Sequence, residues 1–159
     1  MMMNALLDES IYTHSDEEVF KLVDPARVME RDGYGRLPLH LAAELSSSMA
    51  VTKALIKAHE GALREANKYG NLPLHYAAGS NPSVAVVKTL IKAHKGALRE
   101  ANEHGNLPLH LAAGSNSSEA VIKALIKANE SALYMPNEHG DLPLHLAAAC
   151  NSSDRKSVV

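Results

Sequence analysis

Apolar residues follow two alternating patterns along this chain. The first is a string of seven residues, Leu-Pro-Leu-His-Leu-Ala-Ala. The second is a stripe of apolar residues at positions i, i+1, i+4 and i+5, and its clearest example consists of Val121, Ile122, Leu125 and Ile126. This spacing places the four side chains on one face of an α-helix, which predicts a helix over residues 119–128 with Ser118 as its N-cap.

The seven-residue string occurs four times at a constant spacing of 35 residues. Its copies occupy residues 37–43, 72–78, 107–113 and 142–148, and the second copy has Tyr76 where the others have leucine. Four copies in the same phase predict an internal repeat rather than an ordinary globular core.

Each period is divided by turn-forming residues. Asn102-Glu103-His104-Gly105 is typical of a turn, because asparagine and glycine readily adopt the positive φ that tight turns require. A short inner helix is expected from Leu107, with Pro108 in its first turn, where the missing amide proton costs little. An outer helix and an irregular return loop, residues 129–136, complete the period.

These motifs resemble the ankyrin-repeat family, whose signature is Thr-Pro-Leu-His-x-Ala-Ala after an Asp-x-x-Gly turn and before an outer helix with Val-Val-x-x-Leu-Leu. The resemblance covers residues 15–153. It implies an all-α fold, an α-solenoid of stacked helix-turn-helix repeats with short turn or hairpin tips. We divide the chain, as a single domain of residues 1–159, into an N-terminal capping half-repeat (1–31), three repeats (32–66, 67–101 and 102–136) and a truncated fourth repeat (137–159).

The chain departs from the family pattern in two respects. Its period is 35 residues where the family has 33, and leucine replaces the threonine that caps the inner helix in the family. We therefore expect the inner helices to begin one residue earlier than in the family pattern, with Asn71, Asn106 and Asp141 as N-caps in place of the threonine. Arg36 does not suit this role, so the first inner helix is expected to be the worst capped.

The two ends of the chain deviate from the repeat. Ser15 and Glu18 form a capping box that predicts a helix before Pro25, and residues 4–11 are a candidate inner helix of the capping half-repeat. After Ser153, which matches the N-caps of the outer helices, no apolar stripe follows. Because a terminal repeat needs a polar outer face, we expect either a piece of a longer array or an end covered by a partner or a second copy. Self-association through this end is therefore an expectation to test.

Composition narrows the classes of protein. The 159 residues carry 16 Lys plus Arg and 18 Asp plus Glu, a formal net charge of -2, whereas a dedicated binder of nucleic acid or anionic membranes usually has a basic excess. The single cysteine, Cys150, excludes an intramolecular disulfide and a cysteine-cluster metal site. Because the N-terminus has neither a signal peptide nor an apolar span, we expect a cytoplasmic or nuclear protein that does not enter a membrane.

Nine histidines raise the question of a metal or catalytic site. Four of them occupy equivalent positions in the repeats, namely His40, His75, His110 and His145. Stacked repeats lie roughly 10 Å apart, whereas zinc ligands converge on one ion at about 2 Å. We therefore interpret these histidines as structural, buried and bonded to the turn backbone, as the family resemblance also implies. No catalytic or phosphate-binding motif occurs, so we expect no enzyme activity, cofactor, metal or small-molecule substrate.

The turns vary in sequence while their frame stays constant. The frame includes the turn glycines Gly35, Gly70, Gly105 and Gly140. In ankyrin-like proteins the turn tips bind protein partners, which implies a binding surface made of Tyr34, Arg36, Lys68, Tyr69, Asn71, Glu103, His104, Asn106, Glu138, His139 and Asp141. Tyr34, Arg36 and Tyr69 are the strongest candidates, because tyrosine and arginine often dominate binding energy. The alternative is that recent duplication left the tips without selection for binding.

Three functions are consistent with these patterns. The one we favour is a non-catalytic protein-protein interaction module, with contact mainly at the tips because inner-helix residues such as Gly79 and Ser80 are small. The chain is alternatively a regulatory or targeting segment of a larger multidomain protein or enzyme. The third alternative is weak nucleic-acid binding by a convex lysine ladder made of Lys53, Lys57, Lys88, Lys92, Lys123 and Lys127.

Overall fold

The computed structural model describes residues 24–115 and 118–156, and these residues form helices and turns without a strand. The helices in chain order are α2 (Pro38–Leu45), α3 (Met49–Ala58), η3 (Glu60–Arg64), α4 (Pro73–Ser80), α5 (Val84–Ala93), η4 (Lys95–Arg99), α6 (Pro108–Ser115), α7 (Glu119–Ala128), η5 (Glu130–Tyr134) and α8 (Pro143–Lys156). The α elements are α-helices and the η elements are short 3-10 helices. The all-α fold expected from the sequence is confirmed.

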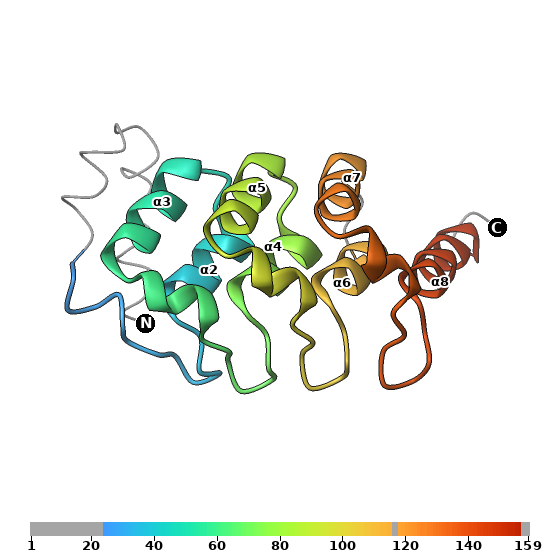
Figure 1. The fold of residues 1–159 in the computed structure, drawn as a ribbon, viewed down its shortest axis with the longest axis horizontal. Helices are drawn as coiled ribbons and strands as arrows, with labels where there is room; N and C mark the ends of the chain where they lie inside the picture. Colours follow the sequence, from blue (N-terminus) through green and yellow to red (C-terminus); the bar gives the residue numbers. More distant parts are fainter. Residues whose placement is uncertain (1–23, 116–117, 157–159) are drawn as a thin grey trace.

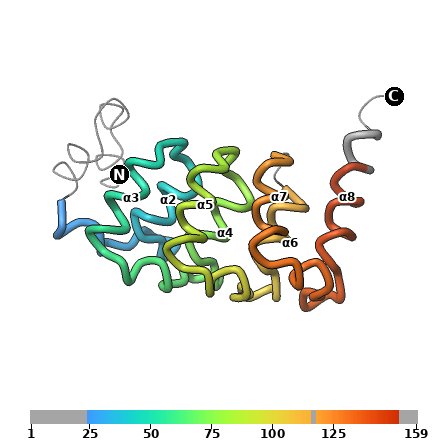
Figure 2. Tube along the Cα trace, turned by 45° about the horizontal axis from the view of Figure 1, so that its top comes forward, coloured from blue at the N-terminus to red at the C-terminus, as the bar shows by residue number. Residues whose placement is uncertain are grey.

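The helices stack in two layers. Figure 1 shows the inner helices α2, α4, α6 and α8 in one row, the outer helices α3, α5 and α7 in a second row, and four turn tips on the same side of the molecule. The tube in Figure 2 shows the same helix pairs following one another along the long axis. Each inner helix packs on the next one, which is the arrangement of a solenoid.

Small and branched aliphatic residues form the core between the layers. Ala42, Ala43, Ala77 and Ala78 are fully buried, so the inner helices approach one another closely. Leu39 and Leu74 fill the space beside them, and Val51 and Val86 cover them from the outer layer. Aromatic residues contribute little to this core, as the composition indicates.

The inner helices begin one residue later than expected. Leu37 and Leu72 occupy the N-cap positions of α2 and α4, with Pro38 and Pro73 as the first helical residues. The Nδ1 atom of His40 accepts a hydrogen bond of 3.0 Å from the Leu37 backbone N–H. In each of the three remaining copies, the motif histidine accepts the equivalent bond from the leucine N–H, at 2.9–3.0 Å.

The expectation that Asn71, Asn106 and Asp141 cap these helices is therefore wrong. The Oδ1 atom of Asn71 accepts a hydrogen bond from Asn102 instead, and the Oδ1 atom of Asn106 accepts one from Asn137. The first inner helix is not capped worse than the others, because the histidine supplies the cap in each repeat. This arrangement leaves the N-cap leucine free to be buried in the core.

The outer helices begin where the sequence predicts. The side chains of Ser48, Ser83 and Ser118 accept hydrogen bonds from backbone N–H groups three residues later. The return loops differ from the expected irregular stretch, since each contains a short 3-10 helix. These helices form because an Ala-Leu pair in each of the first two loops, such as Ala62 and Leu63, is buried against the core.

The two ends carry the remaining differences. The helices expected within residues 4–11 and after Ser15 in the capping half-repeat lie outside the described residues. Helix α8 runs from Pro143 to Lys156, so Ser153 lies within a helix and is not the N-cap of an outer helix. Ala149 stands where the second and third repeats have glycine, and the change from glycine to alanine favours continued helix.

Candidate partner-binding surface

Each tip is a tight turn held by one polar side chain. The Oδ1 atom of Asp32 accepts hydrogen bonds of 2.9 Å from the backbone N–H groups of Tyr34 and Arg36. Asn67, Asn102 and Asn137 hold the later tips in the same way. The four turn glycines have φ between 72° and 82°, which confirms the positive φ expected for glycine. No asparagine among the described residues has a positive φ.

Neighbouring tips are joined by backbone hydrogen bonds. The N–H groups of Lys68, Glu103 and Glu138 donate to the carbonyl oxygens of Tyr34, Tyr69 and His104, respectively, at 3.1–3.2 Å. The variable positions therefore lie in a regular row on one edge of the molecule (Figure 1). Seven of the predicted site residues are exposed there, and we call them the tip row: Tyr34, Lys68, Tyr69, Glu103, His104, Glu138 and His139.

The first two tips form an aromatic end of the tip row. The rings of Tyr34 and Tyr69 lie 6.5 Å apart with an interplanar angle of 35°, and these residues are 56% and 43% exposed. The Arg36 guanidinium lies 5.2 Å from the centre of the Tyr34 ring, within the range of a cation–π contact. Lys68 reaches back to the first tip, where its Nζ donates to the Gly33 carbonyl at 2.7 Å.

The last two tips form an acidic end that also carries histidines. The Nδ1 atom of His104 lies 3.3 Å from the Glu138 carboxylate, and the Nε2 atom of His139 lies 3.5 Å from the same carboxylate. Glu103 is 3.5 Å from His104. All four side chains are exposed, so solvent screens these contacts and each is weak.

The other four predicted residues are half-buried and hold the tips in place. Arg36 forms ion pairs with Asp32 at 2.7 Å and with Glu44 at 3.2 Å. Partial burial raises the pKa of Asp32, but hydrogen bonds from Arg36 and Tyr34 outweigh this effect, so the pKa lies below its ordinary value. Asn71 and Asn106 accept hydrogen bonds from the following tip. The Asp141 carbonyl accepts one from His110.

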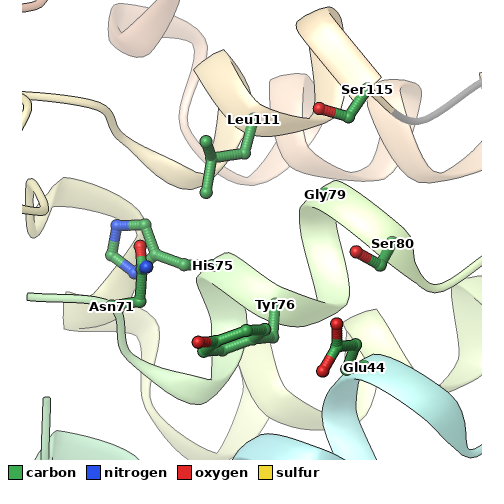
Figure 3. Close-up of a pocket in the computed structure, with 8 residues that line it drawn as sticks. All are labelled: Glu44, Asn71, His75, Tyr76, Gly79, Ser80, Leu111 and Ser115. Carbon is green, nitrogen blue, oxygen red and sulfur yellow. The ribbon is translucent and has the colours of Figure 1, made fainter. Parts of the chain in front are cut away.

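A shallow groove of about 180 Å³ lies beside the tips. Its lining comes from α2, α4, α6 and one tip, as Figure 3 shows: Glu44, Asn71, His75, Tyr76, Gly79, Ser80, Leu111 and Ser115. The small residues Gly79 and Ser80 leave the space open. Sequence reasoning did not select Tyr76, although it is the one departure from leucine at its position in the repeat. Its hydroxyl accepts a hydrogen bond of 2.8 Å from Asn67.

Three of the four motif histidines have the expected structural role. The Nε2 atoms of His40, His75 and His110 donate to backbone carbonyls of the following tip at 3.1 Å, while Nδ1 accepts from the N-cap residue. Burial lowers the pKa of His40 and His75 to about 4 and also lowers that of His110. Both ring nitrogens are thus occupied and the rings stay neutral. His145 departs from the expectation because 56% of its side chain is exposed.

The remaining candidate features are a metal site, a membrane span and the lysine ladder. Across the described ranges, no three His, Cys, Asp or Glu residues are arranged to hold a metal ion. None of the helices there is long and apolar enough to cross a membrane. The six lysines of the convex ladder are exposed on α3, α5 and α7, and Lys123 pairs with Glu119 at 2.6 Å.

Two models of known protein families match the chain. One, for ankyrin repeats in three copies, matches residues 9–103, and the other, for ankyrin repeats in many copies, matches residues 93–147. Stacked helix pairs and regularly spaced tips define an α-solenoid of the class that generally mediates protein-protein interaction and is typically non-catalytic. The chain belongs to the ankyrin-repeat family. A search among curated proteins finds no match.

Proposed function

We propose that the chain is a protein-protein interaction module whose partner binds the tip row, with its main contacts at the aromatic end. The observation that carries this proposal is the pair of exposed tyrosines, Tyr34 and Tyr69, on adjacent tips. The turn hydrogen bonds of these residues are made by their backbone N–H groups and not by their rings. Exposed tyrosines held on a rigid frame are typical anchors of protein interfaces.

The groove extends the same surface toward the inner helices. It lies beside the half-buried Asn71 and Tyr76, next to the aromatic tips, and is open to solvent (Figure 3). A partner that covers Tyr69 is therefore able to place one side chain against Leu111 and Gly79. The Glu44 carboxylate at its edge is already paired with Arg36, which favours an apolar or hydroxyl-bearing side chain in the groove.

Capture of partners by paired variants tests this proposal. Wild-type chain and the Tyr34→Ala/Tyr69→Ala variant are immobilised, and the proteins that each retains from the native cell extract are compared. The proposal predicts a loss of at least about tenfold in captured partner, since a tyrosine that acts as a hot spot contributes about 2 kcal/mol.

Tyr134 provides the matched control, because it is 73% exposed and lies in η5, away from the aromatic tips. The Tyr134→Ala variant should capture the partner as well as the wild type does. Circular dichroism melting of all three chains shows whether folding is preserved. Equal capture by the double variant and the wild type would exclude the aromatic end as the binding site and leave the fold unaffected.

A further inference from the structure

Two clefts open between neighbouring return loops, on either side of the short helix η4. The return loops lead from the outer helices to the tips (Figure 1). The first cleft, between the first and second repeats, has a volume of about 460 Å³, and its lining includes Arg64, Leu72, His94 and Glu100. The second, between the second and third repeats, has a volume of about 360 Å³, and its lining includes Lys95, Leu98, Arg99 and Ala128. We call the two clefts together the return-loop surface.

The two clefts repeat one arrangement. In the first cleft, Arg64 of one repeat is part of the lining together with His94 of the next repeat. In the second cleft, Arg99 is part of the lining together with Asn129, and both of these residues lie 35 positions further along the chain. The return-loop surface therefore presents one arginine at each of two successive junctions between repeats.

Each cleft combines an apolar floor with a charged rim. A leucine is buried at the floor of each cleft, whereas Arg64, Lys95 and Arg99 are exposed. The lining residues of both clefts include one carboxylate, that of Glu100. The return-loop surface is therefore cationic, although the chain has a net charge of -2.

The three cations of the return-loop surface are not paired with carboxylates. Over residues 24–115 and 118–156, no hydrogen bond or ion pair joins the side chain of Arg64, Lys95 or Arg99 to another residue. Arg36, by contrast, is held by two carboxylates. A carboxylate of a partner is therefore able to bind these cations without displacing an existing ion pair.

The second repeat carries more positive charge in its return loop than its neighbours do. Lys95 begins η4, whereas Glu60 and Glu130 begin the equivalent helices η3 and η5. The cations therefore gather around η4. Because complementary charge directs association, this distribution favours an acidic partner.

The spacing of the arginines indicates the conformation of that partner. Arg64 and Arg99 occupy equivalent positions in adjacent repeats, and stacked repeats lie roughly 10 Å apart. In a polyproline II helix, side chains three residues apart lie on the same side, separated by about 9 Å. In a β-strand, side chains on the same side are separated by about 7 or 13 Å, and neither value matches the repeat.

The single carboxylate of the return-loop surface distinguishes an acidic polypeptide from a nucleic acid. Glu100 follows Arg99 in the chain and shares the first cleft with Arg64. A nucleic acid carries a charge at every nucleotide, so a strand that follows the two arginines places a phosphate near this carboxylate. A polypeptide with carboxylates at a wider spacing places an uncharged residue there.

From these observations we propose that the return-loop surface binds an acidic protein segment in the polyproline II conformation, with a carboxylate at every third residue. Two successive carboxylates pair with Arg64 and Arg99, and an uncharged residue between them lies against the apolar floor of the first cleft. Lys95 adds positive charge beside Arg99. This site is independent of the tip row and of the partner proposed for it.

Fluorescence polarisation with two labelled peptides tests the site. The probe peptide consists of Asp-Pro-Pro triplets, which place a carboxylate at every third residue of a polyproline II helix. The comparison peptide has the same composition, but its aspartates stand at every second residue and the remaining prolines follow. The full chain should bind the probe peptide several times more tightly than the comparison peptide. Equal binding of the two peptides, or no binding of the probe peptide, would overturn the proposal.

Charge-reversal variants locate the site on the molecule. Arg64→Glu/Arg99→Glu should weaken binding of the probe peptide at least about tenfold, because two attractions become repulsions. Lys53→Glu/Lys88→Glu changes the net charge equally, but these lysines lie on the outer helices α3 and α5. At about 0.15 M salt, where charges are screened beyond about 8 Å, this control should bind within about twofold of the wild type. Equal weakening by both variants would overturn the proposal.

Two further measurements separate the return-loop surface from other modes of binding. The Tyr34→Ala/Tyr69→Ala variant should bind the probe peptide as the wild type does, even though it is expected to lose the partner of the tip row. Loss of peptide binding in this variant would assign the peptide to the tip row and overturn the proposal. Oligothymidylate serves as the nucleic-acid probe and should bind more weakly than the probe peptide. Tighter binding of the oligonucleotide would contradict an acidic polypeptide as the ligand.

Discussion

Each buried motif histidine joins two repeats through a single ring. In His75, Nδ1 accepts from the N-cap leucine of its own repeat, and Nε2 donates to the Asn106 carbonyl in the next tip. The first bond replaces the threonine cap of the family pattern, and the second fixes the spacing of the tips. Since Nδ1 accepts a hydrogen bond only when it carries no proton, protonation of the ring must break the bond to the N-cap leucine.

Acidification should therefore destabilise the chain between pH 6.5 and 4. Burial lowers the pKa of His40 and His75 from 6.5 to about 4, so in this range the unfolded chain binds protons that the folded chain excludes. The free energy of unfolding should fall as the pH falls, by about 3 kcal/mol for each histidine over the whole window. Urea unfolding at a series of pH values measures it.

His75→Asn is the control for this pH dependence. Asparagine keeps an acceptor near the position of Nδ1 and has no proton to gain, so the variant should be less stable at neutral pH but show a shallower dependence. Stability that does not change between pH 6.5 and 4 would contradict the neutral, doubly bonded state of these rings.

The turn glycines allow a comparison between equivalent positions. Gly105 and Gly140 have φ of 72° and 82°, so alanine at either position strains the backbone by roughly 1–2 kcal/mol. Only Gly105 also faces a neighbouring tip, where the new Cβ would lie 2.6 Å from Glu138 N. Gly105→Ala should therefore cost about 3 kcal/mol or more, clearly above Gly140→Ala. Chemical denaturation of the monomeric chain measures both, and equal costs would show that the tips do not pack as described.

Among the helices, the sequence predicts the outer ones better than the inner ones. Ser118 and the apolar stripe that begins at Val121 are local signals, and the helix over residues 119–128 forms as they predict. The N-cap predicted for α4 was wrong, because Leu72 occupies the N-cap position and is buried by the stack. The His75 ring caps the helix in place of a polar N-cap side chain, and this role depends on tertiary packing. The groove was not predicted for the same reason, because its walls come from three different helices that only the packing brings together.

The tip row itself was predictable because it follows from the repeat. A fixed frame with variable positions shows in the printed sequence, and Tyr34 and Tyr69 lie side by side as that pattern suggests. The division of the eleven predicted site residues into the exposed tip row and four half-buried residues was not predictable. Arg36 and Asn71 form bonds to residues that are 8 and 31 positions away, and no local pattern indicates them.

The serine caps give a direct test of the outer helices. Ser48→Ala removes the side chain that accepts from the Val51 N–H at 3.4 Å and should cost about 1 kcal/mol. For a chain of this length the melting temperature should fall by about 2–4 °C. The neighbouring Ser47 is exposed and lies before the helix, so Ser47→Ala should leave the melting temperature within about 1 °C. Equal shifts would refute the assigned cap.

As a whole, the molecule is a row of units that each contact only their neighbours. Its stability should therefore depend on position within the row. Leu109→Ala creates a cavity between repeats and should cost about 2–5 kcal/mol. Leu144→Ala, at a residue of helix α8 that is 70% exposed, should change stability by about 0.5 kcal/mol or less. Unfolding at a concentration that keeps the chain monomeric provides the comparison. A similar loss for both would show that Leu144 is covered within the single chain.

Binding through the tip row distinguishes this account from one in which the repeats serve only as a spacer or bind through the convex lysines. A photo-crosslinking amino acid is placed at Tyr69 in one chain and at the exposed Lys88 of helix α5 in another, and both are irradiated in the native extract. We predict a discrete crosslinked protein at Tyr69 that competes away with unlabelled wild type and is absent at Lys88. The same partner crosslinked equally at Lys88, or only there, would contradict binding through the tips.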